Sequence, residues 1–192
     1  MRWLYLNVFA ISLVLEVKLL SMEVVEELEK RPWWNYLEGD LQRLLTTSYF
    51  LLDVVKSWGA DLTGGKKELH DFSFIVFPAA KAYEGFLKKL FLDLKFITEE
   101  DYYGKHFRIG KSLNPSLPRE IRVHSVYTKI VHYCGGKKLA DNLWETWRVC
   151  RNLTFHWFPN EKNITTLPEA CERLQMVVNS IDGAFKDCRI AA

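Results

Sequence analysis

The sequence predicts an all-α protein, and three observations support this fold class. Apolar residues recur three and four positions apart along most of the chain, which is the spacing of one face of a helix. Strand signals are missing, because no alternating segments are joined by hairpin turns between β-branched runs. Hydrophobic residues make up 48% of the chain and aromatic residues 14%, which is enough for a packed core and excludes a disordered protein.

Helical spacing marks six segments, which cover residues 23–29, 33–58, 71–95, 124–133, 137–157 and 168–185. Gly59 is expected to end the second segment, because glycine readily adopts the left-handed conformation that terminates helices. Asp71 is expected to cap the third segment. Pro78 either kinks this third helix or marks its first turn, in which case the helix begins later, near Phe77.

Loops with glycine and proline separate these segments. Residues 61–67 contain two consecutive glycines, and residues 95–121 contain two glycines and two prolines. We expect the second stretch to be a long irregular connection of the kind that often carries function. Pro159 should end the fifth helix, because its ring would clash with a carbonyl of the preceding turn. Pro168 and Glu169 favour the first turn of the last helix.

The N-terminal segment is open to several interpretations. Residues 3–15 are almost wholly apolar and follow Arg2, and the run is interrupted at Glu16 and Lys18. This run is too short for a full membrane span, and no small-residue cleavage pattern follows it. The plainer interpretations are a buried helix or a translated extension upstream of an alternative start at Met22. The others are a signal-peptide core and a short membrane anchor.

The charge and the cysteines exclude several kinds of protein. A net charge of +2 leaves no polycationic arm, so any contact with nucleic acid must be local. The cysteines form no C-x-x-C pair and have no histidine cluster near them, which argues against a zinc site. We interpret them as reduced thiols of a cytoplasmic protein. They are Cys134, Cys150, Cys171 and Cys188.

A short motif near the end of the fifth predicted helix combines two side chains of complementary chemistry. The segment RNLTFH covers residues 151–156 and places Arg151 five positions before His156. Histidine titrates near neutral pH, and arginine is a fixed cation. Such a pair suffices in principle for cleavage of RNA without a metal. A base takes the proton from a ribose 2′-OH, and a cation stabilises the charge that builds on the phosphate.

The spacing of this pair raises a geometric question. On an ideal α-helix the two side chains diverge by about 140°, so they do not share a face. Either the helix loosens before Pro159, or Arg151 swings its long side chain towards the histidine, or each residue faces a partner helix across an interface. His156 is expected in the last helical turn. The plainer interpretation is an exposed arginine and a histidine that caps the helix.

The motif resembles the R-N-x-x-x-H signature of the HEPN superfamily, and the helix after it is similar to that family's closing helix. The resemblance covers residues 33–187 and implies an all-α bundle of about four to five core helices, often dimeric. Residues 1–32 are then an N-terminal helical extension of a HEPN-like domain at 33–192, and residues 97–122 form a longer insertion than the family pattern has. The apolar residues of the closing helix are Ala170, Leu174, Val177, Val178, Ile181 and Phe185.

The resemblance also implies roles for individual residues. Many members of the family are metal-independent ribonucleases of toxin–antitoxin and defence systems, and the motif arginine and histidine of two protomers meet across their dimer interface. Arg151 would stabilise the transition state, His156 would be the base or acid, and Asn152 matches the polar residue that commonly follows the arginine. Residues 82–90 resemble the RNase LS type of toxin, whose acidic residue on an earlier helix matches Glu84. On its residues alone, this glutamate is a solvated partner of lysines on the neighbouring turns.

A second candidate for RNA contact lies in the insertion. Aromatic residues alternate with cations over residues 102–108, and such clusters can stack bases and hold phosphates. The plainer interpretation is loop packing. The candidate RNA-binding residues of this cluster are Lys105, His106 and Arg108.

The sequence therefore leads to one main functional hypothesis and two others. The main one is a toxin-type endoribonuclease that needs no cofactor or metal and leaves 2′,3′-cyclic phosphate and 5′-OH ends. Its site would form in an isologous homodimer that brings two arginines and two histidines into one cleft. The alternative is a non-catalytic HEPN module for dimerisation or nucleotide binding, paired with a nucleotidyltransferase or an antitoxin. The third is a helical protein tethered to a membrane by residues 3–15.

Overall fold

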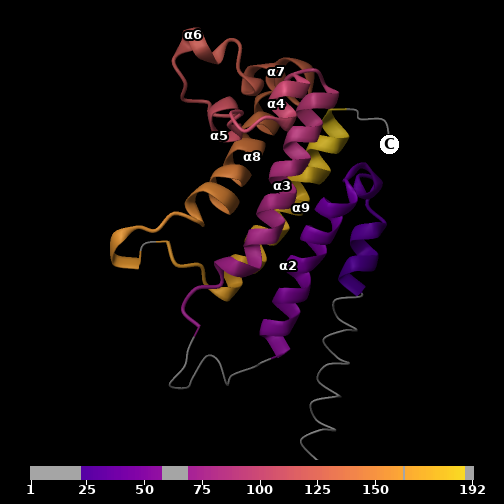
Figure 1. Cartoon of the computed structure of the whole chain (residues 1–192), viewed down its shortest axis with the longest axis vertical. Coiled ribbons are helices and arrows are strands. Elements are labelled where there is room, and N and C mark those ends of the chain that lie inside the picture. Colours follow the sequence, from indigo (N-terminus) through magenta and orange to yellow (C-terminus); the bar gives the residue numbers. More distant parts are fainter. Residues whose placement is uncertain (1–22, 58–68, 162, 189–192) are drawn as a thin grey trace, which may run out of the picture.

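The computed structural model describes residues 23–57, 69–161 and 163–188, and every regular element in these ranges is a helix. The predicted all-α fold class is therefore confirmed. The four longest elements are α2 (Gly39–Ser57), α3 (Ser73–Asp93), α8 (Gly136–Trp147) and α9 (Leu167–Asp187). The shorter ones are η1 (Trp34–Tyr36), α4 (Glu99–Tyr103), α5 (Ile109–Ser112), α6 (Arg119–Arg122), α7 (Val126–Tyr133), η3 (Arg148–Leu153) and η4 (Pro159–Glu161). Figure 1 shows α3 packed beside both α2 and α9, with α4 to α7 gathered at one end.

The residues that precede α2 pack against α9. Residues 23–29 are helical, as expected, and Leu28 is buried in the same core as the later helices. Arg31 forms an ion pair of 2.9 Å with Asp182 of α9, and the indole Nε1 of Trp33 donates to the same carboxylate. One acidic side chain of α9 thus fixes the N-terminal part of the described chain.

The second predicted helix is shorter than expected. A single helix over residues 33–58 is wrong at its start, because the chain forms the 3-10 turn η1 and an extended residue at Leu37 before α2 begins. Extended backbone at that residue breaks the run of helical dihedrals, although the apolar spacing continues through it. The predicted stop at Gly59, the loop over 61–67 and the apolar run over 3–15 lie outside the described residues.

Pro78 lies inside α3, so the alternative in which it marks the helix start is wrong. Asp71 contributes to the start of α3 but does not occupy the N-cap position, which is Phe72. It lies one residue earlier, and its Oδ1 accepts from the backbone N of Ser73 at 2.9 Å. Proline has no amide proton, and its ring disturbs the bonding of the surrounding turn. The amide of Ala79 donates instead to the buried Oγ of Ser48 in α2, at 2.8 Å. This hydroxyl ties α2 to α3 at the proline.

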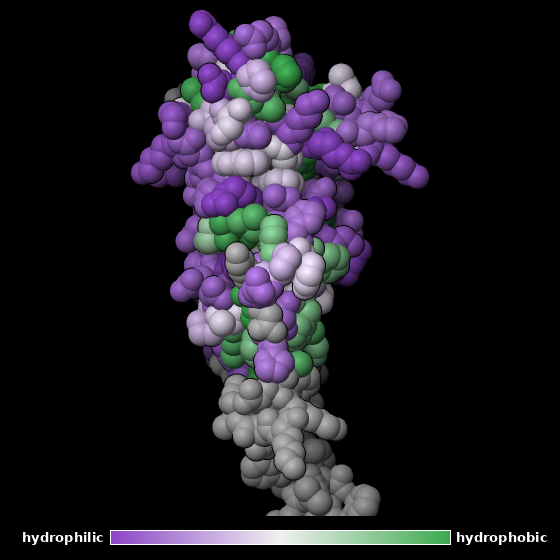
Figure 2. Space-filling model, turned by 90° about the vertical axis from the view of Figure 1, so that its left-hand side faces the viewer, coloured by the Kyte–Doolittle hydropathy of each residue, from purple (hydrophilic) through white to green (hydrophobic). Residues whose placement is uncertain are grey.

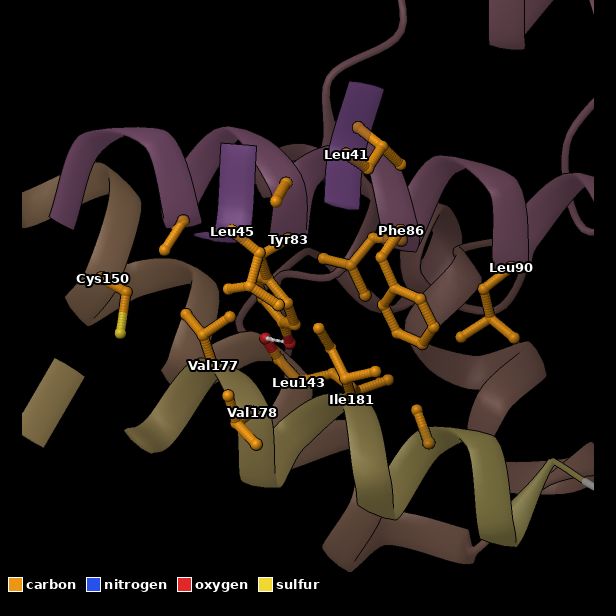
Figure 3. Close-up of a cluster of buried hydrophobic side chains, with 14 of the residues drawn as sticks. Leu41, Leu45, Tyr83, Phe86, Leu90, Leu143, Cys150, Val177, Val178 and Ile181 are labelled. Atoms are coloured by element: carbon orange, nitrogen blue, oxygen red, sulfur yellow. Dashed lines mark hydrogen bonds between the residues drawn. The ribbon is translucent and has the colours of Figure 1, made fainter. Parts of the chain in front are cut away.

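The core is centred on Tyr83 of α3, which is fully buried between three helices. Its hydroxyl lies 2.8 Å from the Oγ of Ser180 in α9 and donates to the carbonyl of Leu143 in α8, at 3.2 Å. Burial raises the pKa of this phenol, so it stays a neutral donor. It belongs to a cluster of buried apolar side chains (Figure 3). They include Leu45, Phe86, Leu90, Val177, Val178 and Ile181. Because Tyr83 is anchored in this way, the next residue of α3, Glu84, has a defined position.

The insertion over residues 97–122 is more regular than expected. It contains the three short helices α4, α5 and α6 rather than one irregular loop. Thr98 begins α4 with a capping box, in which its Oγ1 accepts from the backbone of Asp101 and that residue's carboxylate accepts in return. The sequence alone would have allowed this capping box to be predicted, because a threonine three positions before an acidic residue is the usual pattern of a capping box.

Two of the four cysteines form a disulfide, so the prediction of four reduced thiols is wrong for Cys134 and Cys188. The bond joins the residue after α7 to the residue after α9, with Cα atoms 4.4 Å apart. Cys150 and Cys171 are free thiols. Disulfides are typical of oxidising compartments. The cysteines therefore no longer support the prediction of a cytoplasmic protein, which rested on four reduced thiols.

The last helix matches its prediction closely. Thr166 caps α9, and its hydroxyl and backbone exchange hydrogen bonds with Glu169, with Pro168 in the first turn. The hydrogen bonds from Thr166 hold the pKa of the Glu169 carboxyl below its usual range. Of the helices that the structure describes, none combines the length and apolar character needed to cross a membrane.

Candidate functional site

Arg151 lies on a π-helix, η3, which follows α8 directly. A π-turn closes bonds from residue i to i+5, is rare, and is frequent at functional sites. The hydroxyl of Thr154 donates to the carbonyl of Val149 five residues earlier, at 2.6 Å. The sequence left open whether the helix loosens before Pro159. The helix does loosen, because α8 continues into the wider turns of the π-helix. The predicted helix over 137–157 thus changes geometry at residue 148 and ends earlier than expected.

His156 lies beyond the end of η3, in a bend, so the prediction that it belongs to the last helical turn is wrong. Its Nε2 lies 3.2 Å from the Oδ1 of Asn152. An amide oxygen only accepts, so this contact places a proton on Nε2 and leaves Nδ1 as the available base in the neutral ring. The imidazole is exposed to solvent and is held through an adjacent motif residue.

Glu84 pairs with the motif arginine. The Nε of Arg151 donates to the Oε2 of Glu84 at 3.2 Å, and the two side chains are 41% and 37% exposed. The alternative in which Glu84 pairs with neighbouring lysines is not what the structure shows. Lys88 donates to the carbonyl of Tyr102, and Lys81 lies over the ring of Phe77. Among the described residues the Nη groups of the arginine have no hydrogen-bond partner, which leaves them open to an anion.

Two residues that sequence reasoning missed hold the motif in place. Asn163 donates from its Nδ2 to the carbonyls of His156 and Leu153. Arg173 of α9 donates from its Nη1 to the hydroxyls of Thr154 and Thr165. Both threonines are buried. These contacts connect the motif to a loop and to the next helix, and no local pattern in the sequence indicates them.

The Glu84–Arg151 ion pair separates two pockets, each of about 460 Å³. We call the first the α5 pocket, because α5 forms one wall and α8 with η3 forms the other. The second, the α3 pocket, lies between α3 and the ring of Phe155. Both residues of the ion pair line both pockets, and Asn152 lines the α5 pocket.

The three predicted RNA-binding residues of the insertion do not form one cluster at the candidate site. Arg108, the residue directly before α5, lines the α5 pocket together with Lys111 of that helix. Lys105 and His106 are exposed, and neither lines a pocket at the motif. The structure therefore brings Arg108 to the candidate site and leaves the other two on the surface nearby.

The candidate site combines the imidazole of His156 with several cations. In the described part of the chain, no group of three histidine, cysteine or acidic side chains is placed to hold a metal ion. Five cations line the two pockets, and Glu84 is the only carboxylate that does so. Such a surface attracts a phosphate. His156 lines neither pocket, but its imidazole contacts Asn152, which lines the α5 pocket.

Comparison of the chain with protein-family models, with curated proteins and with solved structures gave no match.

Proposed function

We propose that this protein is a metal-independent endoribonuclease of the HEPN type, which cleaves RNA to 2′,3′-cyclic phosphate and 5′-OH ends. The observation that carries the proposal is that Glu84 and Arg151 pair between two cationic pockets, while Asn152, which lines one of them, contacts His156. The Nδ1 of His156 takes the proton from a ribose 2′-OH, and the free N–H groups of Arg151 bind the phosphate. Glu84 orients the guanidinium, and Asn152 orients the imidazole.

The chemistry itself gives a reason for a homodimer. The 2′-oxygen attacks phosphorus, the bond from phosphorus to the 5′-oxygen breaks, and the leaving oxygen needs a proton. The motif has a single histidine in each chain, which supplies a base but no acid. In an isologous dimer, His156 of one protomer is the base and its symmetry copy, in the protonated form, is the acid. The dimer also brings the Arg151 side chains of both protomers to the phosphate, so two guanidinium groups can bind it.

Exposed aromatic residues next to the motif provide a surface for this dimer. Phe77 is 51% exposed, and its ring packs edge-on against Phe155 at 5.2 Å between centroids. Trp157 is 81% exposed and directly follows the histidine, and Phe158 comes next. Figure 2 shows the face towards which the motif segment projects, where apolar areas are bordered by polar ones. Aromatic residues are enriched at protein interfaces, and their central contacts carry most of the binding energy.

The proposal is tested by analysing the products of purified protein on single-stranded RNA in buffer with EDTA. We expect fragments whose 5′ ends accept phosphate from polynucleotide kinase directly and whose 3′ ends carry a cyclic phosphate. His156→Ala and Arg151→Ala should each lower kcat by at least about 100-fold. The matched controls are His124→Ala and Arg43→Ala, which change exposed residues outside the site and should leave the rate unchanged. A need for a divalent metal, or 3′-OH ends, would contradict the mechanism.

The composite site is tested by mixing the two inactive variants. If the cleft contains groups of both protomers, heterodimers of the two alanine variants hold one Arg151 and one His156 in the same cleft. They keep a cation and the base but lack the second histidine as acid, so they should regain only a small part of the activity, which neither variant shows alone. Light scattering at micromolar concentration should show a dimer. Nucleotide binding without cleavage, unaffected by either substitution, would instead favour the non-catalytic module that works with a nucleotidyltransferase or an antitoxin.

A further inference from the structure

The α5 pocket contains positive charge that no carboxylate neutralises. Arg108 and Lys111 line it, and in the described part of the chain neither forms an ion pair. By contrast, the structure pairs Arg31, Lys137 and Arg148 with carboxylates elsewhere on the surface. Two unpaired cations at the mouth of one pocket favour an anionic ligand.

Aromatic rings form much of the rest of this pocket. Trp144 and Trp147 of α8 stack with ring centroids 5.7 Å apart and planes 20° from parallel, and Phe107 lies on the opposite wall. Gly110 allows α5 to lie against the indole, because a Cβ at that position would come 2.2 Å from Cη2 of Trp147. The pocket is therefore lined by half-buried aromatic rings, which form an aromatic surface beside two cations.

Two amide groups in the pocket have donors available. The Oδ1 of Asn114 accepts from the backbone of Ser116, and the Oδ1 of Asn152 contacts His156. Their Nδ2 groups have no hydrogen-bond partner among the described residues. Amide NH₂ groups of this kind donate to the acceptor atoms on base edges.

We propose that the α5 pocket is a nucleotide subsite, in which the aromatic surface stacks one base and the cations Arg108 and Lys111 bind its phosphate. Rings beside cations are the combination that holds single-stranded nucleic acid. A volume of about 460 Å³ falls within the range of small-ligand sites. Arg151 and Asn152 belong both to this pocket and to the motif. The bound nucleotide is thus a neighbour of the scissile phosphate, and Asn114 contributes to the choice of base.

This inference rests on the proposed ribonuclease function for identifying the nucleotide as part of an RNA strand. The chemistry of the pocket alone would also accept a free nucleotide. Binding is therefore measured in the His156→Ala background, where cleavage is removed and the pocket is complete. The ligands are fluorescent single-stranded octamers of A, C or U, and the corresponding nucleoside monophosphates.

Two substitutions separate stacking from charge. Trp144→Leu should weaken binding of the octamers about 5- to 150-fold, with no change in salt dependence. Its control is Tyr133→Leu, which removes another aromatic ring, 65% exposed and outside the pocket. Lys111→Gln should lower the slope of log K against log salt by about 0.7. Its control is the exposed Lys138→Gln. Asn114→Ala should change the order of preference among the three octamers.

The outcomes distinguish the subsite from the ribonuclease proposal. Equal affinities for the Trp144→Leu and Tyr133→Leu proteins, together with an unchanged salt slope for Lys111→Gln, would overturn the subsite and leave the cleavage chemistry standing. Monophosphate binding that depends on Trp144, in a wild-type protein that cleaves no RNA, would support a nucleotide site and reject the ribonuclease. Lys111 is exposed, so its result holds even if the tryptophan variant folds poorly.

Discussion

Arg173 shows how a single side chain can control the candidate site without touching a substrate. Its Nη1 donates to Thr154 at the end of the π-helix and to Thr165 at the start of the α9 cap. Its carbonyl accepts from the Sγ of Cys150 at 3.5 Å, and burial raises the pKa of that thiol to about 12. Two points of contact with η3 therefore come from one residue of α9. These contacts hold the motif segment in its observed geometry.

We expect Arg173→Met to lower the free energy of unfolding by about 1–3 kcal/mol, because two buried hydroxyls lose their donor. Under the proposed function it should also lower kcat while leaving KM unchanged, since Arg173 positions the motif and contacts no RNA. Urea unfolding and initial cleavage rates measure the two effects. Arg43→Met is the control, because that arginine is exposed and such surface changes stay within about 0.5 kcal/mol. Equal behaviour of the two variants would refute a positioning role.

At the scale of elements, the wall of the α5 pocket depends on how closely two helices approach. Gly110 lies in α5, against the six-membered ring of Trp147 in α8. The π-helix η3 follows α8, and its consecutive residues Arg151 and Asn152 both line the pocket. The pocket is therefore a product of one small residue and one irregular turn.

Gly110→Ala should destabilise the protein by about 1–3 kcal/mol, because its Cβ has no room and either α5 or the indole must move. Gly183→Ala is the matched control. It lies in the interior of α9, where the nearest atom, Leu139 Cδ1, is 3.8 Å from the added Cβ. Alanine there should be neutral or stabilise by up to about 1 kcal/mol. Urea unfolding of the two variants measures the difference, and equal stability of both would contradict the packing described.

At the scale of the whole molecule, one covalent bond links the ends of two helices that close the bundle. The disulfide joins residues that are 54 positions apart. It connects the end of α7, which packs on α8, to the end of α9. A cross-link of this length limits the unfolded chain much more than the folded one.

Cys134→Ser should lower the free energy of unfolding by about 2–4 kcal/mol, and a reducing agent should lower the stability of the wild type by a similar amount. The variant itself should not respond to reductant. Cys171→Ser is the control, because it removes a free, half-buried thiol. Denaturant unfolding with and without dithiothreitol measures all three proteins. If the reductant left the free energy of unfolding of the wild type unchanged, the disulfide would contribute nothing to stability.

Much of the fold could be predicted because helix signals are local. The capping box at Thr166, the role of Asp71 at the start of α3 and the closing helix were each readable within one or two turns of sequence. The predictions failed where backbone geometry changed without a change in apolar spacing, as at Leu37 and at the π-helix. Periodicity measures which face is buried and does not distinguish one helical turn type from another.

By itself, the sequence determined the helical class and the order of the long helices, because caps, breakers and periodicity act over short distances. Only the tertiary structure decided that Glu84 pairs with Arg151 across 67 positions, that Cys134 pairs with Cys188, and that the α5 pocket opens beside the motif. These contacts join segments far apart in the chain. Their geometry depends on how α3, α8 and α9 pack around Tyr83, and no local pattern contains that information.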